Sequence, residues 1–494
     1  MDAEMASWKS TGTYVDEVPP PGANINSGMW IFRVKRPPGS PPAFKARYVA
    51  RGFSQREGVD FFQTFSPTPK MTTLRVLLHV AAQRDYELHS LDFSTAFLQC
   101  SLHEEIWLRR PPGFTEWFPT GTQWSLRRPV YGLRQAPREW HDTLRTTLAS
   151  LGFAPSTADP SLFLRTDATL PPFYVLVYVD DLVFATADTE ALALVKSELQ
   201  KRHTCTELGE LTSYLGLRIT RDRAQRTITL TQSHMVQQVL QRFGFTYSSP
   251  QSTPLPTGHS LSAPPSDESV EPSGPYPELV GCLITSGMGL VVGGRTRVVL
   301  TGHADASWVD DLATSSCEAE IYAGAMAAQE LRWLTYLLTD LGEVPRSPPV
   351  LYVDNKAMLA LCQEHRTKHI ALRYFLAREL QQRGQIRLAY VASQANTADV
   401  FTKALQPCDH QPCFAFLDWS CDLLFSPTLP MGSLPSTLNG ATTTTTTDKT
   451  SITDEDTYRH FVTSAERPAT PVFTARINSN RHHHHVSFDH QVVK

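Results

Sequence analysis

The feature that most constrains this chain is a pair of adjacent acids between two apolar runs. Asp180 and Asp181 join residues 173–179 to residues 182–186, and both runs have the composition of buried β-strands. Two carboxylates at the tip of such a hairpin repel each other unless solvent or a cation offsets the repulsion. The apolar flanks limit access of solvent, so the pair favours a cation site. Taken alone, the motif also fits an acidic turn between two surface strands.

A third acid ends another short strand-like run earlier in the chain. Asp92 closes residues 88–92 and precedes small residues and then Phe97. Small residues let backbone N–H groups approach a phosphate, and the Phe97 ring could lie under a sugar or simply belong to the core. Residues 137–151 have the apolar spacing of a helix that connects neighbouring strands of one sheet. Carboxylates on rigid elements hold the two divalent cations, about 3.5–4 Å apart, that phosphoryl transfer uses.

Bulk composition places the chain among globular proteins. Its 494 residues, 41% of them apolar, suffice for roughly two to four domains. The net charge of −4 argues against a generally basic nucleic-acid binder. Residues 28–112, however, hold 12 Lys/Arg against 7 Asp/Glu, an excess that suits a phosphate backbone or an ordinary solvated face. The cysteines form no CxxC pair, and neither a signal peptide nor a membrane-spanning run is evident, so we expect an intracellular protein.

Shifts in composition divide the chain into segments. We expect an extended N-terminal segment (1–27), a first domain (28–248), a Pro/Ser-rich linker (249–278), a second periodic region (279–405) and a low-complexity, disordered tail (406–494). The three acids described above all lie in the first domain.

Six runs of the first domain form a recognisable series: 45–55, 64–75, 91–98, 131–137, 178–181 and 208–217. In their order and spacing, residues 28–255 resemble the reverse transcriptases of copia-type retrotransposons. The resemblance implies an α+β fold, a right-hand polymerase with fingers, palm and thumb. It also implies RNA-directed DNA polymerase activity on an RNA or DNA template-primer, with no membrane partner. One departure is Cys100, where the family usually has glycine; a cysteine is tolerable there if the backbone needs no positive φ.

The same resemblance assigns roles residue by residue. Asp92, Asp180 and Asp181 would bind two Mg²⁺ ions, for which Mn²⁺ can substitute. The family positions around the incoming deoxynucleoside triphosphate are Lys35, Lys45, Arg47, Phe97, Gln135 and Tyr178. Phe97 would exclude a 2′-hydroxyl, Gln135 would touch the nucleotide or template, and a basic residue of the group would contact the triphosphate. A protein of this kind would be cytoplasmic in particles, or nuclear.

The second periodic region resembles a truncated RNase H-like α/β domain. Four acids in family order carry this resemblance and imply two-metal hydrolysis of RNA in a hybrid: Asp305, Glu320, Asp354 and Asp399. The resemblance implies a two-stranded hairpin between the first and second acids, but fourteen residues separate Asp305 from Glu320, too few for two strands of about five residues each with their turns. We therefore infer an internal deletion here. The family also has a long helical connection that is missing near 279–288, which implies a second gap there.

The two inferred deletions determine what we expect of the RNase H site and of the polymerase site. The strand expected at 298–304 would be left as an unprotected sheet edge. The RNase H site would be poorly ordered and its activity impaired, whereas the polymerase site can assemble. The alternative is a catalytically inactive transposon remnant that only binds nucleic acid.

Overall fold

The chain folds into two units in the computed structural model. The first comprises Met1–Gln232, Val292–Arg295 and Tyr336–Glu343, and the second comprises Ser233–Val291, Thr296–Thr335 and Val344–Lys494. The structure describes residues 1–35, 41–114, 121–248, 290–294, 298–306, 316–363, 375–399, 421–425 and 472–479. The predicted linker and the predicted gap near 279–288 lie outside the described residues.

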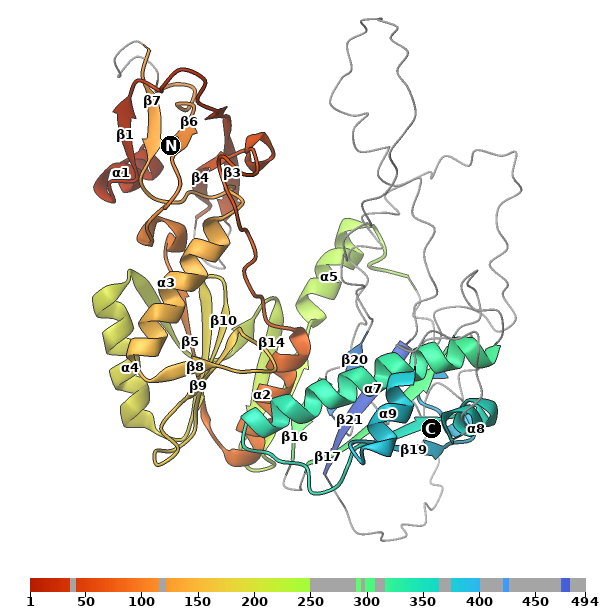
Figure 1. Cartoon of the computed structure of the whole chain (residues 1–494). Coiled ribbons are helices and arrows are strands. Elements are labelled where there is room, and N and C mark those ends of the chain that lie inside the picture. The colour runs from red at the N-terminus through yellow and green to blue at the C-terminus, as the bar shows by residue number, and fades with distance from the viewer. Residues whose placement is uncertain are drawn as a thin grey trace, which may run out of the picture. The chain divides into compact units, whose positions relative to one another are not determined.

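A six-stranded antiparallel sheet forms the centre of the first unit (Figure 1). Its order is β12 (Cys205–Glu210), β5 (Glu87–Phe93), β11 (Asp181–Thr186), β10 (Phe173–Tyr178), β9 (Leu162–Arg165) and β8 (Phe153–Pro155). The adjacent strands β10 and β11 confirm the two predicted runs around the acid pair. Residues Tyr174–Val177 and Leu182–Ala185 of these strands are buried and largely apolar because helices cover both faces of the sheet.

The two faces of the sheet pack against different helices. On one face, Val177 and Phe184 share a buried core with Trp140 of α3 (Ala136–Ser150) and Leu199 of α4 (Thr189–Arg202). The helix α2 (Met71–Arg84) covers the other face and buries most of its own side chains. The helix predicted between the two acid motifs is therefore confirmed as α3.

Residues 1–27, expected to be extended, instead fold into the first unit. Helix α1 (Asp2–Ser10) buries Trp8 completely, with its ring centroid 5.9 Å from that of Tyr48 and 5.6 Å from that of Trp124. The sheet beside it has the order β1 (Tyr14–Glu17), β7 (Gln123–Leu126), β6 (Ile106–Leu108) and β2 (Ile25–Asn26). The sequence concealed this arrangement because one tryptophan, rather than a periodic apolar stripe, anchors the helix.

Two hairpins complete the strand structure of this part of the chain. Strand β3 (Gly28–Lys35) pairs antiparallel with β4 (Ala43–Ala50), and large apolar residues alternate with basic ones along this hairpin. A separate sheet has the order β13 (Ser213–Tyr214), β14 (Leu217–Asp222), β15 (Thr227–Thr231) and β16 (Leu290–Gly293). Helix α5 (Ser233–Arg242) follows β15 in the chain.

The segment Tyr336–Glu343 belongs to the first unit, although it lies far along the chain. Its Asp340 carboxylate accepts hydrogen bonds from the Ser156 hydroxyl (2.6 Å) and the Thr157 backbone N–H (3.1 Å). The Tyr174 hydroxyl donates to the Leu341 carbonyl (2.9 Å). The first unit is therefore assembled from separate stretches of sequence.

The second unit contains a five-stranded mixed sheet. Its order is β19 (Arg387–Tyr390), β18 (Val350–Val353), β17 (Val298–Asp305), β21 (Val472–Ser479) and β20 (Cys421–Phe425). The first three strands are parallel, and the last two pair antiparallel. Its helices are α7 (Ser316–Asp340), whose last residues belong to the first unit, α8 (Lys356–Gln363) and α9 (Leu376–Gln382). No helix in the described part of the chain is long and apolar enough to cross a membrane.

Two expectations about this sheet are wrong. Strand β17 was expected to be an unprotected edge, but it pairs along its whole length with β21. Strands β20 and β21 come from the tail that was expected to be disordered, and the rest of that tail lies outside the described residues. The physical reason is that an open edge exposes unpaired N–H and C=O groups, which a distant strand can satisfy as well as a near one.

Candidate active site

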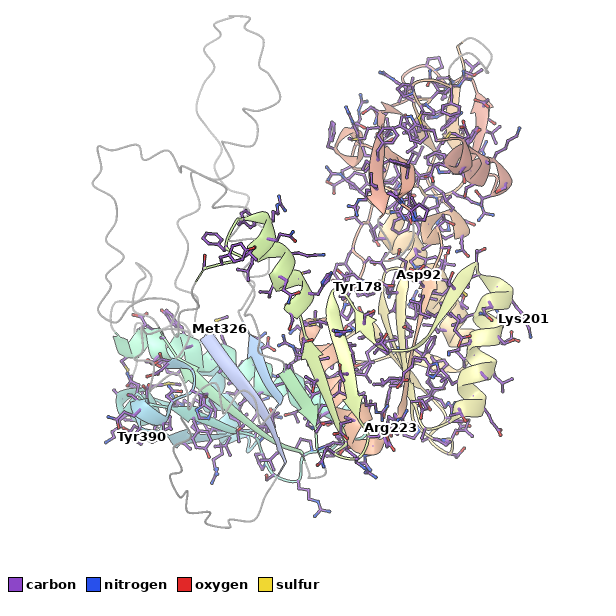
Figure 2. All side chains as sticks on the ribbon, turned by 180° about the vertical axis from the view of Figure 1, so that it is seen from behind. Asp92, Tyr178, Lys201, Arg223, Met326 and Tyr390 are labelled. Atoms are coloured by element: carbon purple, nitrogen blue, oxygen red, sulfur yellow. The ribbon has the colours of Figure 1, made fainter. Side chains whose placement is uncertain are left out.

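Strand pairing brings three distant acids to one end of the six-stranded sheet. Strand β11 pairs with β5 in a register that sets Asp181 directly opposite Asp92. The Phe93 backbone N–H also donates to the Asp180 carbonyl at 2.8 Å. Figure 2 shows Asp92 and Tyr178, the last residue of β10, at the same end of these strands. The two acid motifs, predicted to lie on neighbouring strands, are thus held together by backbone hydrogen bonds.

The turn that carries the acid pair has an unusual backbone. Val179 has a φ of +55°, in the left-handed region. A β-branched residue adopts such a conformation at a cost of about 1–3 kcal/mol, so surrounding contacts must hold it there. One of these contacts is a hydrogen bond from the Trp140 indole Nε1–H to the Val179 carbonyl, 2.6 Å long. This strain could not be predicted from the residue type, because valine is a common strand residue.

The electrostatics of the three acids suit a divalent cation. Burial, together with the neighbouring Asp180 and Asp92 carboxylates, raises the pKa of Asp181 to about 6. Burial and Asp92 likewise raise the pKa of Asp180, against the lowering effects of its backbone hydrogen bond, Arg47 and Lys45. Hard cations favour a set of half-buried carboxylates that repel one another, so these residues fit Mg²⁺.

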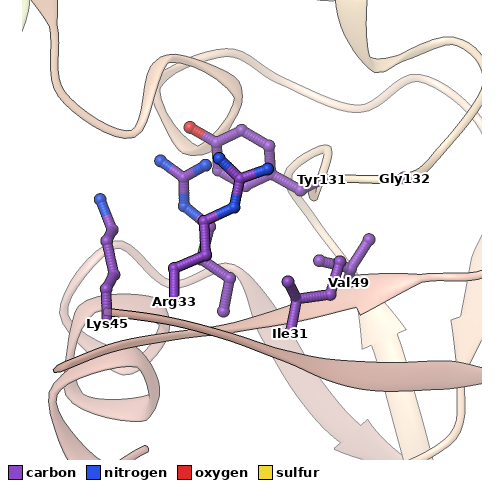
Figure 3. Close-up of a pocket in the computed structure, with 7 residues that line it drawn as sticks. Ile31, Arg33, Lys45, Val49, Tyr131 and Gly132 are labelled. Carbon is purple, nitrogen blue, oxygen red and sulfur yellow. The ribbon is translucent and has the colours of Figure 1, made fainter. Parts of the chain in front are cut away.

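A basic pocket lies on the β3–β4 hairpin, beside the three acids of the sheet. Its volume is about 450 Å³, and it is lined by Ile31, Arg33, Lys45, Arg47, Val49, Tyr131 and Gly132. Arg33 is directly opposite Lys45 across the hairpin, so both project from one face, and Figure 3 shows them below the Tyr131 ring. The Arg47 guanidinium lies 4.4 Å from the centre of that ring. The positive charges of Arg47 and Lys45 also act on Asp180, where they offset part of the rise in its pKa.

The pocket contains some of the predicted nucleotide contacts and two residues that we missed. Lys45 and Arg47 line it, whereas the side chain of Lys35 lies outside the described residues. Arg33 and Tyr131 were not predicted. The signal for Arg33 was available, since period-two alternation places it on one face with a basic partner opposite.

Of two further predicted nucleotide contacts, Phe97 adjoins this pocket through Tyr131 and Tyr178 lies at the end of β10. Phe97 is 8% exposed, and its ring packs edge-to-face against Tyr131 with centroids 4.8 Å apart. Tyr178 is half-buried at the end of β10. Both positions are compatible with the predicted roles, which remain predictions.

Gln135 does not have the place predicted for it. Its side chain is fully buried, accepts from the Gln55 side-chain amide at 2.9 Å and donates to the Asp60 carbonyl at 2.8 Å. Gln55 also accepts from the Arg134 backbone N–H at 2.8 Å. A buried amide bonded at both ends cannot touch a ligand, so the prediction of a nucleotide contact is wrong. Gln135 instead fastens the loop around residue 60 to the start of α3.

Cys100, the one departure from the family pattern, is explained by its backbone conformation. Its φ is −111°, so the backbone there needs no glycine. The thiol is buried and donates to the Phe97 carbonyl at 3.3 Å, and burial raises its pKa to about 12. The left-handed conformation in this turn belongs to Thr95, with a φ of +53°.

Three of the four acids predicted in the second unit also meet. Ligand oxygens of Asp305, Glu320 and Asp354 all lie within 4.8 Å of one another, and the first two residues are buried. Among the described residues, Asp92, Asp180 and Asp181 do not converge as closely as this. Our expectation of a poorly ordered site is therefore wrong for these three carboxylates. The reason is that β17 and β18 are parallel neighbours, so Asp305 and Asp354 at their carboxyl ends lie at the same end of the sheet. The missing hairpin is not needed for this placement.

Asp399, the fourth acid of this set, follows a turn that is hydrogen-bonded to the same end of the sheet. The Asn396 side-chain amide donates to the Ala304 carbonyl at 3.0 Å, next to Asp305. The Asp399 backbone N–H then donates to the Asn396 carbonyl at 3.1 Å.

Comparison with known proteins gives one family match and several relatives. Residues 14–257 match the family described as reverse transcriptase (RNA-dependent DNA polymerase). The chain is 31% identical over 461 residues to the retrovirus-related Pol polyprotein from transposon RE2 of Arabidopsis thaliana, covering 78% of the chain and 31% of that relative. It is 28% identical over 484 residues to the corresponding polyprotein from transposon TNT 1-94 of Nicotiana tabacum, covering 82% and 36%. The chain thus spans about a third of the length of these relatives.

Among solved structures, a foamy viral protease-reverse transcriptase in complex with double-stranded DNA overlaps 78% of this chain and 68% of its own. The identity is 14% and the TM-score is 0.39. We base no conclusion on so distant a likeness.

Replacing Asp181 with asparagine should stabilise the metal-free protein at neutral pH. The pKa of Asp181 is raised to about 6, so its ionisation costs more in the folded chain than in the unfolded chain, where the pKa is about 3.9. The cost is absent below about pH 4 and complete above about pH 6. In EDTA at about pH 7.5, Asp181→Asn should therefore have a higher Tm than wild type, and the difference should vanish near pH 4.

Asp188→Asn is the matched control. The Ala191 backbone N–H and Arg165 lower the pKa of Asp188, so its ionisation favours folding and this variant should gain no stability at neutral pH. An unchanged or lower Tm for Asp181→Asn near pH 7.5 would contradict the assignment of repulsion at the site.

Proposed function

The chain belongs to the reverse transcriptases of copia-type retrotransposon polyproteins, and from that premise we propose that it extends a primer by RNA-directed DNA synthesis. The primer 3′-hydroxyl would attack a deoxynucleoside triphosphate and release pyrophosphate. The observation that carries the proposal is the placing of Asp92 opposite Asp181, with Asp180 beside a basic pocket. Its partners would be RNA and DNA template-primer, and its location cytoplasmic in particles, or nuclear.

Asp92, Asp180 and Asp181 would hold two Mg²⁺ ions, which Mn²⁺ can replace. When bound, such ions activate the attacking hydroxyl and stabilise charge on the leaving group. The chain's own contribution is to fix the carboxylates at one sheet end through backbone pairing, where half-burial keeps them poorly hydrated. In the right-hand description, the six-stranded sheet would be the palm, the β3–β4 hairpin part of the fingers, and α5 the start of the thumb.

The basic pocket would receive the triphosphate. Arg33, Lys45 and Arg47 present three cationic groups in a space of about 450 Å³ next to the acids. Guanidinium groups bind phosphate oxygens with paired hydrogen bonds, and the Tyr131 ring holds Arg47 in place. Phe97, packed against that same ring, would limit the space for a 2′-hydroxyl.

Primer extension on an RNA template tests the proposal directly. Asp180→Asn removes a carboxylate from the acid set and should lower incorporation about a hundredfold or more, the equivalent of several kcal/mol of transition-state stabilisation. The control Asp167→Asn changes an exposed acid in a loop and should extend primers normally. Equal incorporation by wild type and Asp180→Asn would favour the alternative, an inactive remnant that only binds nucleic acid.

The pocket assignment predicts a selective effect on nucleotide affinity. Arg33→Ala and Arg47→Ala should each raise KM for the deoxynucleoside triphosphate about tenfold or more, since each removes a charge-assisted hydrogen bond. Arg51→Ala removes an exposed arginine outside the pocket and should leave KM unchanged. If all three variants raised KM equally, general charge rather than the pocket would be responsible.

For the second unit we propose impaired RNase H activity. The three clustered carboxylates support metal binding, but the short connection between Asp305 and Glu320 leaves no room for a strand pair. We expect little cleavage of labelled RNA in a DNA hybrid, and the same level in Glu320→Gln. Robust cleavage that Glu320→Gln abolishes would show that the domain works without the missing segment.

A further inference from the structure

Trp140 is hydrogen-bonded to the turn that carries the acid pair. The residue lies in α3 and is 1% exposed. Its indole Nε1–H donates to the Val179 carbonyl at 2.6 Å, and Val179 immediately precedes Asp180. The carbonyl belongs to the peptide plane that leads into Asp180, so holding it fixes the direction in which the chain enters the acid pair.

Val179 needs such a constraint. With a φ of +55° it occupies the left-handed region, which β-branched residues rarely adopt. The two-residue loop between the paired residues Tyr178 and Asp181 itself requires a positive φ at its first position, here a residue poorly suited to it. The hydrogen bond from Trp140 supports this conformation, because it holds the Val179 carbonyl toward α3.

The same tryptophan also contacts the strand of the third acid. Its ring packs edge-to-face against Phe93, the residue after Asp92, with centroids 4.9 Å apart. Phe93 in turn donates its backbone N–H to the Asp180 carbonyl at 2.8 Å. Trp140 thus contacts both chain segments that carry the acids.

His203 completes this buried aromatic group. Its ring lies edge-on to Trp140 and to Phe93, at centroid distances of 5.5 and 5.6 Å. Its Nε2 is 3.0 Å from the hydroxyl of Thr147, two turns along α3 from Trp140. The indole is therefore held from two sides and has little freedom to turn away from Val179.

We propose that Trp140 is a positioning residue for nucleotidyl transfer. It acts through the backbone, by keeping Val179 in its strained conformation and so setting Asp180 and Asp181 against Asp92. The inference rests on the proposed function, because it assigns Trp140 to the reaction of that same site. A core tryptophan that only fills space would do none of this through its N–H group.

Hydrogen exchange tests the contact without requiring activity. Trp140→Phe keeps a ring against Phe93 and His203 but deletes the donor. Mass spectrometry of peptides covering residues 178–184 should show exchange about threefold to tenfold faster, the range of one hydrogen bond. Trp124→Phe makes the same change in another fully buried tryptophan and should leave this turn unchanged. Equal protection of the turn in wild type and Trp140→Phe would overturn the proposal.

A double-mutant comparison tests the strain. Glycine adopts positive φ readily, so Val179→Gly removes the need for a constraint. In the Val179 background, Trp140→Phe should lower kcat for primer extension about threefold to tenfold, with KM for the triphosphate nearly unchanged. In the Val179→Gly background, the same change should lower kcat less than about twofold. An equal loss of kcat in both backgrounds would mean that Trp140 only packs.

The two proposals can fail separately. If wild type does not extend primers, the proposed function fails, while the exchange experiment still decides whether Trp140 holds the turn. If wild type extends primers and Asp180→Asn does not, but Trp140→Phe matches wild type in exchange and kcat, only the positioning role is overturned.

Discussion

The pairing of β5 with β11 is the constraint on which the rest of the site depends. A shift of one residue in that register would move Asp92 away from Asp181 and turn every side chain of the strand to the opposite face. The shift is prevented by burial on both faces, where Leu91 and Phe184 pack toward α3 and α4 and their neighbours pack toward α2. The hydrophobic core therefore fixes the geometry of the site, while the acids themselves oppose folding through their burial and their mutual repulsion.

The sequence predicted the parts of this fold that follow from local periodicity. The β10–β11 runs, helix α3 and the order of the acids all have apolar spacing or chemical motifs that a single segment reveals. Contacts between distant segments had no such signal. Nothing local indicates that Trp8 would close a core with Tyr48 and Trp124, or that residues from the tail would cover β17.

The same distinction explains the errors at the site. Gln135 lies in a family motif, and motif membership could not show that Gln55 and Asp60 occupy both ends of its amide. Arg33 was missed although it shares a strand face with Lys35, whose side chain lies outside the described residues. The strained backbone of Val179 could not be predicted from the sequence, because the conformation of a turn depends on the surrounding structure. Here that structure includes the indole of Trp140 in α3.

The discontinuous make-up of the first unit has a consequence for its synthesis. Residues Tyr336–Glu343 supply Asp340 to the turn at Ser156 and the Leu341 carbonyl to Tyr174. A ribosome that has translated only as far as the end of the reverse transcriptase match has released Asp92, Asp180 and Asp181 but not these partners. The six-stranded sheet must therefore wait, at about 5–20 residues per second, for several more seconds of elongation before its last contacts can form. Through that interval the nascent unit depends on its own hydrophobic core, so it is least protected during translation.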